Sequence, residues 1–325
     1  MSRFINFAGA ALAFSLLTAC SDPSYETTGT VSPGPRPAPP PDPAEQEFGG
    51  DKRILFGDLH VHSTFSMDAF EQSLPGMGGE GPHPIADACD YARYCSQLDF
   101  WSINDHAMAL TPARWQMTRE AIRQCNAESG ALPDMVAFTG WEWTQIGPTP
   151  DTHWGHKNVI FPGEADAELP PRAIRAGYGT APEFNVPFDA LSSITTPLKG
   201  LFTESGYRRD HWLMLGFMRQ MIGNRPCDPK VPSRELPADC AEGAETPAEL
   251  YRRIDEWSDD YLVIPHGTSW GLYTPPAANW DKQLRDGNHD PARQRLIEVY
   301  SGHGNSEEYR SWRGTAYDAQ GEPYC

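Results

Sequence analysis

The chain has 325 residues, which is enough for one large domain or two ordinary ones. Its formal charge of −18 repels the phosphate backbone of nucleic acids, so we expect no nucleic-acid partner. A mean hydropathy of −0.54, with no long apolar run beyond the N-terminus, argues against a protein that crosses a membrane several times.

The N-terminus resembles a bacterial lipoprotein signal. A short apolar stretch, too short for a transmembrane helix, ends in the sequence LTAC at residues 17–20, which is similar to a lipobox. We therefore predict a signal peptide over residues 1–19 and lipidation of Cys20, with Ser21 implying an outer-membrane lipoprotein that faces the periplasm or is exported to the cell surface. The alternative is an ordinary cleaved signal with a chance cysteine.

A proline-rich segment follows the lipobox. Proline occupies seven of the eleven positions from 33 to 43, a composition typical of a semi-rigid polyproline stalk. We expect residues 20–50 to form a lipidated tether and residues 51–325 to form the folded domain.

Six cysteines remain besides Cys20. They are Cys89, Cys95, Cys125, Cys227, Cys240 and Cys325. An exported protein sits in an oxidising compartment, so disulfides are expected, but six cysteines allow about 15 connectivities. Cys227 and Cys240 lie in one proline-rich stretch and are the favoured local pair. No CxxC motif is present, so a cysteine-rich zinc site is not expected.

Short apolar runs alternate with helical patterns along the rest of the chain. The predicted strands are residues 54–56, 99–103, 135–138, 158–161, 261–264 and 296–300, and the predicted helices are residues 84–98, 112–129 and 246–257. This alternation favours a parallel sheet with both faces covered. Residues 162–243 break the rhythm, with one short helix at 211–221, and are interpreted as a loop-rich insertion, either a lid over the active site or peripheral decoration.

Histidines and carboxylates cluster at the predicted strand ends. His60 and His62 occupy alternate positions of a strand, so both imidazoles point to one side and can bind one metal ion. Further candidate ligands adjoin the other strands: Asp68, His106, Glu142, His156 and His266, with His153 competing with His156. Neutral imidazole suits zinc, iron, manganese or nickel, so the sequence predicts a metal centre.

Six ordered motifs carry a family resemblance. They are residues 56–63, 99–101, 140–144, 155–158, 266–271 and 300–307. Over roughly Arg53 to Glu307 the chain resembles the polymerase and histidinol phosphatase (PHP) superfamily. It is most similar to a bacterial PHP-like lipoprotein family catalogued as a domain of unknown function.

The resemblance implies a distorted (β/α)7-type barrel that holds two or three divalent metal ions (zinc, manganese or iron). It implies that His60 and His62 hold the first metal, that Glu142 bridges two metals, and that Asp68 and His106 bind the second. By the same resemblance His156 and His266 are the remaining imidazole ligands.

The family pattern ends in a late Asp-x-His motif that is missing after His303. We therefore expect a chain that is incomplete at its C-terminus. The alternative is a divergent member that closes its cluster with Asp151, Glu298 or His303.

These ligands predict a metal-dependent hydrolase, most simply a phosphoesterase in which a metal-bound water attacks a small, phosphorylated substrate. Lys157, Trp143 and Trp270 are the candidate substrate-binding residues, and Asp105 is either a residue that orients a ligand or a helix N-cap. Two alternatives remain open. The same site can hydrolyse a C–N or C–O ester bond, or the protein is a lipoprotein that binds a metal or ligand without turnover.

Overall fold

The computed structural model describes residues 22–36, 54–129, 134–177, 190–307, 316–317, 320 and 322–324. The predicted signal peptide, Cys20 and Cys325 lie outside these residues. Within the described ranges, no helix is long and apolar enough to cross a membrane.

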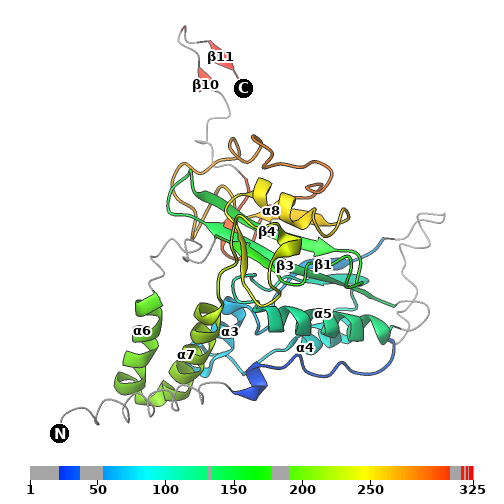
Figure 1. The fold of residues 1–325 in the computed structure, drawn as a ribbon, viewed down its shortest axis with the longest axis vertical. Coiled ribbons are helices and arrows are strands. Elements are labelled where there is room, and N and C mark those ends of the chain that lie inside the picture. The colour runs from blue at the N-terminus through cyan, green and yellow to red at the C-terminus, as the bar shows by residue number, and fades with distance from the viewer. Residues whose placement is uncertain are drawn as a thin grey trace.

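A mixed five-stranded sheet forms the centre of the molecule, with strand order β1-β2-β3-β4-β7 (Figure 1). The strands are β1 (Gly57–Val61), β2 (Phe100–Ile103), β3 (Val136–Ile146), β4 (His153–Phe161) and β7 (Leu262–His266). β1, β2 and β3 pair in parallel, whereas β4 runs antiparallel to both β3 and β7. Short two-stranded pairs lie outside this sheet: β5 (Ile174–Ala176) with β6 (Glu242–Ala244), β8 (Trp270–Gly271) with β9 (Gly304–Asn305), and β10 (Ala316–Tyr317) with β11 (Pro323–Tyr324).

The predicted (β/α)7-type barrel is wrong for the described chain, whose sheet is a curled half-barrel of five strands. The physical reason lies between β3 and β4. Parallel neighbours need a long crossover, usually a helix, but the short connection at residues 147–152 returns the chain as a hairpin. The predicted strand at 296–300 does not join the sheet either, since Tyr300 alone forms an isolated bridge, with Asn305.

The described residues contain six α-helices. They are α3 (Met67–Ser73), α4 (Ile85–Asp90), α5 (Pro112–Ala127), α6 (Ala190–Thr203), α7 (Arg208–Gly223) and α8 (Pro247–Ile254). The helices predicted at 84–98, 112–129 and 246–257 are confirmed as α4 with a π-helical turn (Tyr91–Cys95), as α5 and as α8.

Capping sets where two of these helices begin. Thr111 accepts a hydrogen bond from the backbone N–H of Arg114 at the start of α5, and Thr246 does the same for Glu249 at the start of α8. The buried face of α5 carries Trp115, whose ring meets Trp141 of β3 edge-on at 5.2 Å between centroids. The core therefore fills the space between α5 and the sheet.

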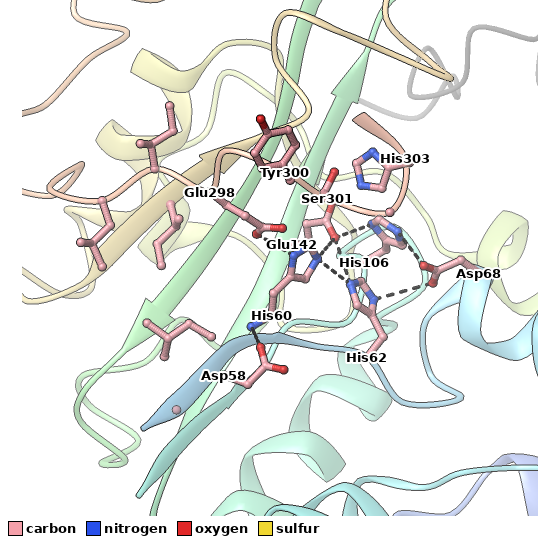
Figure 2. Close-up of a pocket in the computed structure, with 16 residues that line it drawn as sticks. Asp58, His60, His62, Asp68, His106, Glu142, Glu298, Tyr300, Ser301 and His303 are labelled. Atoms are coloured by element: carbon pink, nitrogen blue, oxygen red, sulfur yellow. Dashed lines mark hydrogen bonds and ion pairs between the residues drawn. The ribbon is translucent and has the colours of Figure 1, made fainter. Parts of the chain in front are cut away.

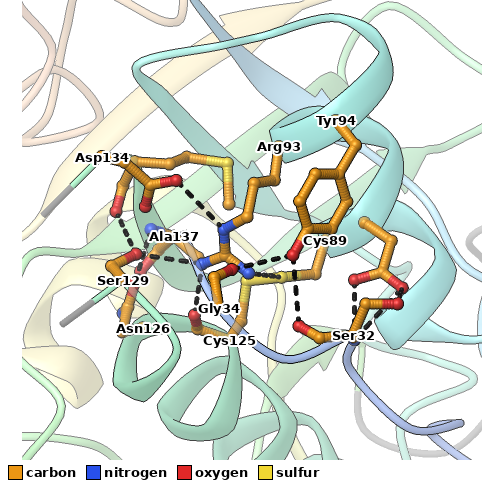
Figure 3. Close-up of a disulfide and its surroundings, with 12 residues drawn as sticks. Ser32, Gly34, Cys89, Arg93, Tyr94, Cys125, Asn126, Ser129, Asp134 and Ala137 are labelled. Atoms are coloured by element: carbon orange, nitrogen blue, oxygen red, sulfur yellow. Dashed lines mark hydrogen bonds and ion pairs between the residues drawn. A yellow bond between two sulfur atoms is a disulfide. The ribbon is translucent and has the colours of Figure 1, made fainter. Parts of the chain in front are cut away.

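Two disulfides stabilise the fold. The predicted pair Cys227–Cys240 is confirmed, and Cys89–Cys125 joins α4 to α5 (Figure 3). The buried guanidinium of Arg93 lies against this second disulfide and donates to the backbone carbonyl of Cys125. Cys95 is free and exposed in the part of the chain that the structure describes.

The folded body begins earlier in the chain than Asp51. Residues 22–36 lie against it, although the sequence placed them in a tether. Tyr25 is buried, and Ser32 donates its hydroxyl to Asp90 at 2.6 Å. Arg36 donates to the carbonyl oxygen of Leu98 at 2.9 Å, which fixes the first part of the proline-rich segment to the body.

Candidate metal centre

The predicted ligands converge around Glu142, and Figure 2 shows His60, His62, Asp68 and His106 gathered beside it. His60 lies at the end of β1, Glu142 in the middle of β3, and His156 in β4. His156 pairs in register with His266, the last residue of β7, and His106 forms an isolated bridge with Glu142. The ligand types are thus aligned by strand pairing.

Three donor atoms from His60, His62 and Glu142 form a nearly equilateral triangle. The Nε2 atoms of His60 and His62 are 3.0 Å apart, and they lie 3.3 and 3.2 Å from Oε2 of Glu142. Donors bound to one ion at about 2.1 Å are themselves about 3.0–3.4 Å apart. The triangle therefore has the size that a single transition-metal ion requires.

The other carboxylate oxygen of Glu142 faces a second set of imidazoles. Oε1 contacts Nδ1 of His156 and lies 3.3 Å from Nε2 of His266. His303 completes this group, in which all ligand atoms lie within 4.8 Å of one another. Glu142 is fully buried between the two sets, the position of a carboxylate that bridges two ions.

Asp68 and His106 form a third group with His62. The carboxylate of Asp68 lies 3.7 Å from Nδ1 of His62 and 3.6 Å from Nε2 of His106. The hydroxyls of Ser66 and Thr144 contact Nδ1 of His62 and Nδ1 of His106, each at 2.8 Å. These contacts leave Nε2 of each ring directed at the other ligands, because hydrogen bonding of one ring nitrogen orients the other.

Glu298 and His303 belong to the same cluster, although neither was among the primary predicted ligands. Glu298 lies 2.8 Å from Nδ1 of His60, and the His303 ring centroid lies 4.0 Å from that of His156. Both had been named, with Asp151, as alternatives for closing the cluster. Asp151 is exposed and belongs to none of the metal-ligand groups found among the described residues.

The carboxylates dominate the electrostatics of the site. Burial lowers the pKa of His60, but its contacts with Glu142 and Glu298 outweigh burial and raise the pKa to about 10. Burial likewise opposes charge on His106, yet Glu142 and Asp68 raise its pKa to about 9. Burial also raises the pKa of Glu142, but the surrounding imidazoles hold it well below its usual range. The site therefore stabilises positive charge, and a metal ion bound there would displace protons.

The residues present fit a cluster of divalent ions. Among the described residues, buried imidazole nitrogens of three cluster members have no hydrogen-bond partner: Nε2 of His156, both ring nitrogens of His266, and Nε2 of His303. Both ring nitrogens of His153, which lies outside the cluster, are also without one. Unpartnered buried polar atoms are costly, and a metal ion would satisfy them. The candidate groups share Glu142, His60, His62 and His266, so they cannot all be filled independently. Imidazole with carboxylate suits zinc, manganese or iron.

A cavity of about 750 Å³ opens onto this cluster. Its lining combines metal-type ligands with apolar residues from β1, from β7 and from residues 296–297. None of the lining comes from the described residues of 162–243, so the described part of the predicted insertion contributes no wall to this cavity.

Two of the predicted substrate-binding residues lie on the opposite face of the sheet. Lys157 follows His156 in β4 and pairs with Trp143 of β3, so both point away from the ligands. Lys157 is fully buried and donates to the carbonyl of Trp154 and to Gln283. The predicted contact of these two residues with substrate is therefore wrong, because strand alternation buries them elsewhere.

Trp270 and His153 also lie outside the cluster. Trp270 is 49% exposed and is not among the residues that line the cavity, so its contact with substrate stays a prediction. His153 is buried, but it belongs to none of the metal-ligand groups found in the described residues. The structure therefore brings His156, and not His153, to the site.

Asp105 holds the backbone next to the candidate ligand His62. Its buried carboxylate accepts hydrogen bonds from the backbone N–H and the hydroxyl of Ser63, at 2.6 and 2.7 Å. Burial raises the pKa of Asp105 to about 6. Because Ser63 follows His62 directly, Asp105 fixes the backbone that carries this ligand.

Comparisons of the chain with protein families, with curated proteins and with solved structures found no match. The class defined so far is therefore structural: a mixed α/β protein with a candidate multinuclear metal centre at one face of a curled sheet.

Proposed function

We propose that the protein is a metal-dependent hydrolase, and specifically a phosphoesterase. The observation that carries this proposal is Glu142, whose two carboxylate oxygens face two separate sets of imidazoles. A carboxylate shared between two ions is the arrangement expected of a two-metal hydrolytic site. The resemblance to PHP metallophosphoesterases supports the same class.

Divalent ions bound here would lower the pKa of a water molecule and polarise a phosphoryl oxygen. The histidines and carboxylates of the cluster would hold these ions. Glu142 supplies the shared negative charge, His60 of β1 and His266 of β7 both face it, and Glu298, in the cavity lining, orients His60. The apolar side chains in the lining give a bound substrate a surface to pack against beside the cluster.

Two other functions use the same residues. An activated water can attack a carbonyl carbon as well as phosphorus, so the same site can hydrolyse an ester or an amide. A lipoprotein that binds metal without turnover is the remaining alternative. We favour the phosphoesterase because two adjacent ions match the charge that develops on a transferring phosphoryl group.

The test combines metal analysis with activity. The purified protein is expected to hold two or three divalent ions per chain by elemental mass spectrometry, and to hydrolyse a generic phosphomonoester or phosphodiester. His60→Ala should lose metal and activity together, whereas the exposed His83, replaced in the control His83→Ala, should leave both unchanged. Turnover of carboxylic esters or amides alone would reassign the substrate, and metal without any turnover would identify a binding protein.

We also propose that Cys20 carries a lipid that anchors the protein to a bacterial outer membrane. The lipobox-like sequence at 17–20 supports this assignment. Cys20→Ser is expected to release the protein from the membrane fraction. Continued partitioning of that variant with membranes would contradict the lipid anchor.

A further inference from the structure

The first described residues are fastened to helix α7. Asp22 pairs with Arg209 at 2.7 Å, and Glu26 accepts a hydrogen bond from Gln220 at 2.8 Å. Between them, Tyr25 is buried in a cluster with Phe70 and Phe217. The chain therefore leaves the body of the protein at the beginning of α7.

This attachment leaves very little chain between the body and the proposed lipid. Cys20 precedes Asp22 by two residues, which span at most about 7 Å when fully extended. A lipid on Cys20 thus places the start of α7 at the membrane surface, instead of at the end of a long stalk.

The surface beside this point has the composition of a membrane-contacting face. In α6 and the turn η4 (Ser205–Tyr207), the large side chains of Leu198, Phe202 and Tyr207 are exposed, by 43%, 79% and 50%. The basic residues Lys199 and Arg208 lie among them and are also exposed, as is the acidic Glu204, which pairs with His211 at 2.8 Å. Apolar and aromatic side chains mixed with basic ones favour insertion at the headgroup level of an anionic bilayer.

Helices α6 and α7 lie side by side and project from the body at the end where the described chain begins, away from the segment between β8 and β9 (Figure 1). We propose that the exposed face of α6 and η4, centred on Phe202, rests on the lipid bilayer that holds Cys20. The inference rests on the proposed lipidation of Cys20 and is independent of the proposed hydrolase activity. We assign this face to a membrane because a lipid on Cys20 would hold the bilayer within two residues of Asp22.

The test uses the full lipidated protein in vesicles of phosphatidylethanolamine and phosphatidylglycerol at a ratio of about 3:1. An environment-sensitive fluorophore is attached through Phe202→Cys in a Cys95→Ser, Cys325→Ser background. The matched control carries it through Leu284→Cys, an exposed apolar position between β8 and β9. Mass spectrometry establishes the lipid on Cys20, and metal content checks that each variant is folded.

At position 202 the emission should rise at least about threefold on vesicles and be quenched by spin-labelled lipids, with no change at position 284. Equal exposure of both labels on lipidated protein would overturn the proposed membrane face. Absence of lipid on Cys20 would overturn it as well. A protected label at 202 in concentrated protein without vesicles would assign the face to a second copy of the chain.

Discussion

Strand β4 carries two neighbouring polar residues, His156 and Lys157, whose side chains lie on opposite faces of the sheet. His156 points to the metal-ligand cluster, where its Nε2 has no hydrogen-bond partner. Lys157 points to the other face, where it donates to Trp154 and Gln283 and its ammonium lies 5.4 Å from the ring of Trp143. The face of His156 therefore carries a ring nitrogen that is available to bind a metal ion. The face of Lys157 carries an ammonium group that is already hydrogen-bonded within the protein. Neighbouring positions in a sequence do not imply a shared site.

The largest effect is expected from the centre of the metal-ligand face. Glu142→Gln keeps the shape of the side chain but removes the negative charge that faces both sets of imidazoles. We expect loss of at least one bound ion and a fall in hydrolytic rate on the order of 10³-fold. Metal analysis and steady-state kinetics measure both, with the exposed Glu120→Gln on α5 as the matched control. Full metal content in Glu142→Gln would remove Glu142 from the ligand set.

A smaller loss is expected at the rim of the same face. Glu298 contacts Nδ1 of His60 at 2.8 Å and therefore orients this ligand from the cavity mouth. Glu298→Ala is expected to weaken metal binding by about 10- to 100-fold, the range typical of residues that hold a ligand in place. Competition with a chelator measures the affinity. If the affinity is unchanged, the contact with His60 has no role in metal binding.

A substitution of Lys157, on the opposite face of the sheet, should change the free energy of unfolding and leave the hydrolytic rate nearly unchanged. Burial lowers the pKa of Lys157 to about 7, and the nearby Lys282 acts in the same direction. An unfolded lysine titrates near about 10.4, so between these values the unfolded chain binds the extra proton and stability rises with pH. The full cost of this buried charge is present below pH 7 and disappears as pH rises toward about 10.

Lys157→Met removes that dependence. The gain in unfolding free energy of the variant over the original protein is expected to be about 4 kcal/mol larger at pH 6.5 than at pH 10. Urea unfolding at several pH values measures this difference, and the hydrolytic rate should stay within about twofold. A large loss of activity with normal stability would return Lys157 to the active site.

The sequence was most informative where a local pattern determines geometry. The HxH spacing correctly predicted that His60 and His62 meet: their Nε2 atoms are 3.0 Å apart, although His62 lies one residue beyond the end of β1. Strand pairing brings His156 next to His266. The disulfide between Cys227 and Cys240 was likewise accessible, since its partners are close in the chain. In each case the decisive contact is either short-range or follows directly from strand geometry.

Other features depend on tertiary structure and left no local signal. The hairpin between β3 and β4 replaced a predicted parallel crossover, which removed the barrel. Alternation in β4 is interrupted where Gly155 adopts a φ of 65° and the pairing with β3 shifts register, so the face of His153 could not be assigned from spacing. Glu298 and His303 come from irregular chain, whose path no periodicity defines.

The smallest effect is expected at Trp270, where the side chain and the backbone act differently. The indole is half exposed and outside the cavity lining, so Trp270→Ala should change KM by less than about twofold. The backbone of β8, in contrast, supports His303 through the pairing of Gly271 with Gly304. A Cβ at Gly271 would lie 2.4 Å from the Cα of Gly304, so Gly271→Ala should displace His303 and weaken metal binding. Kinetics and metal titration of the two variants separate these roles, and a tenfold rise in KM for Trp270→Ala would show that the indole binds substrate after all.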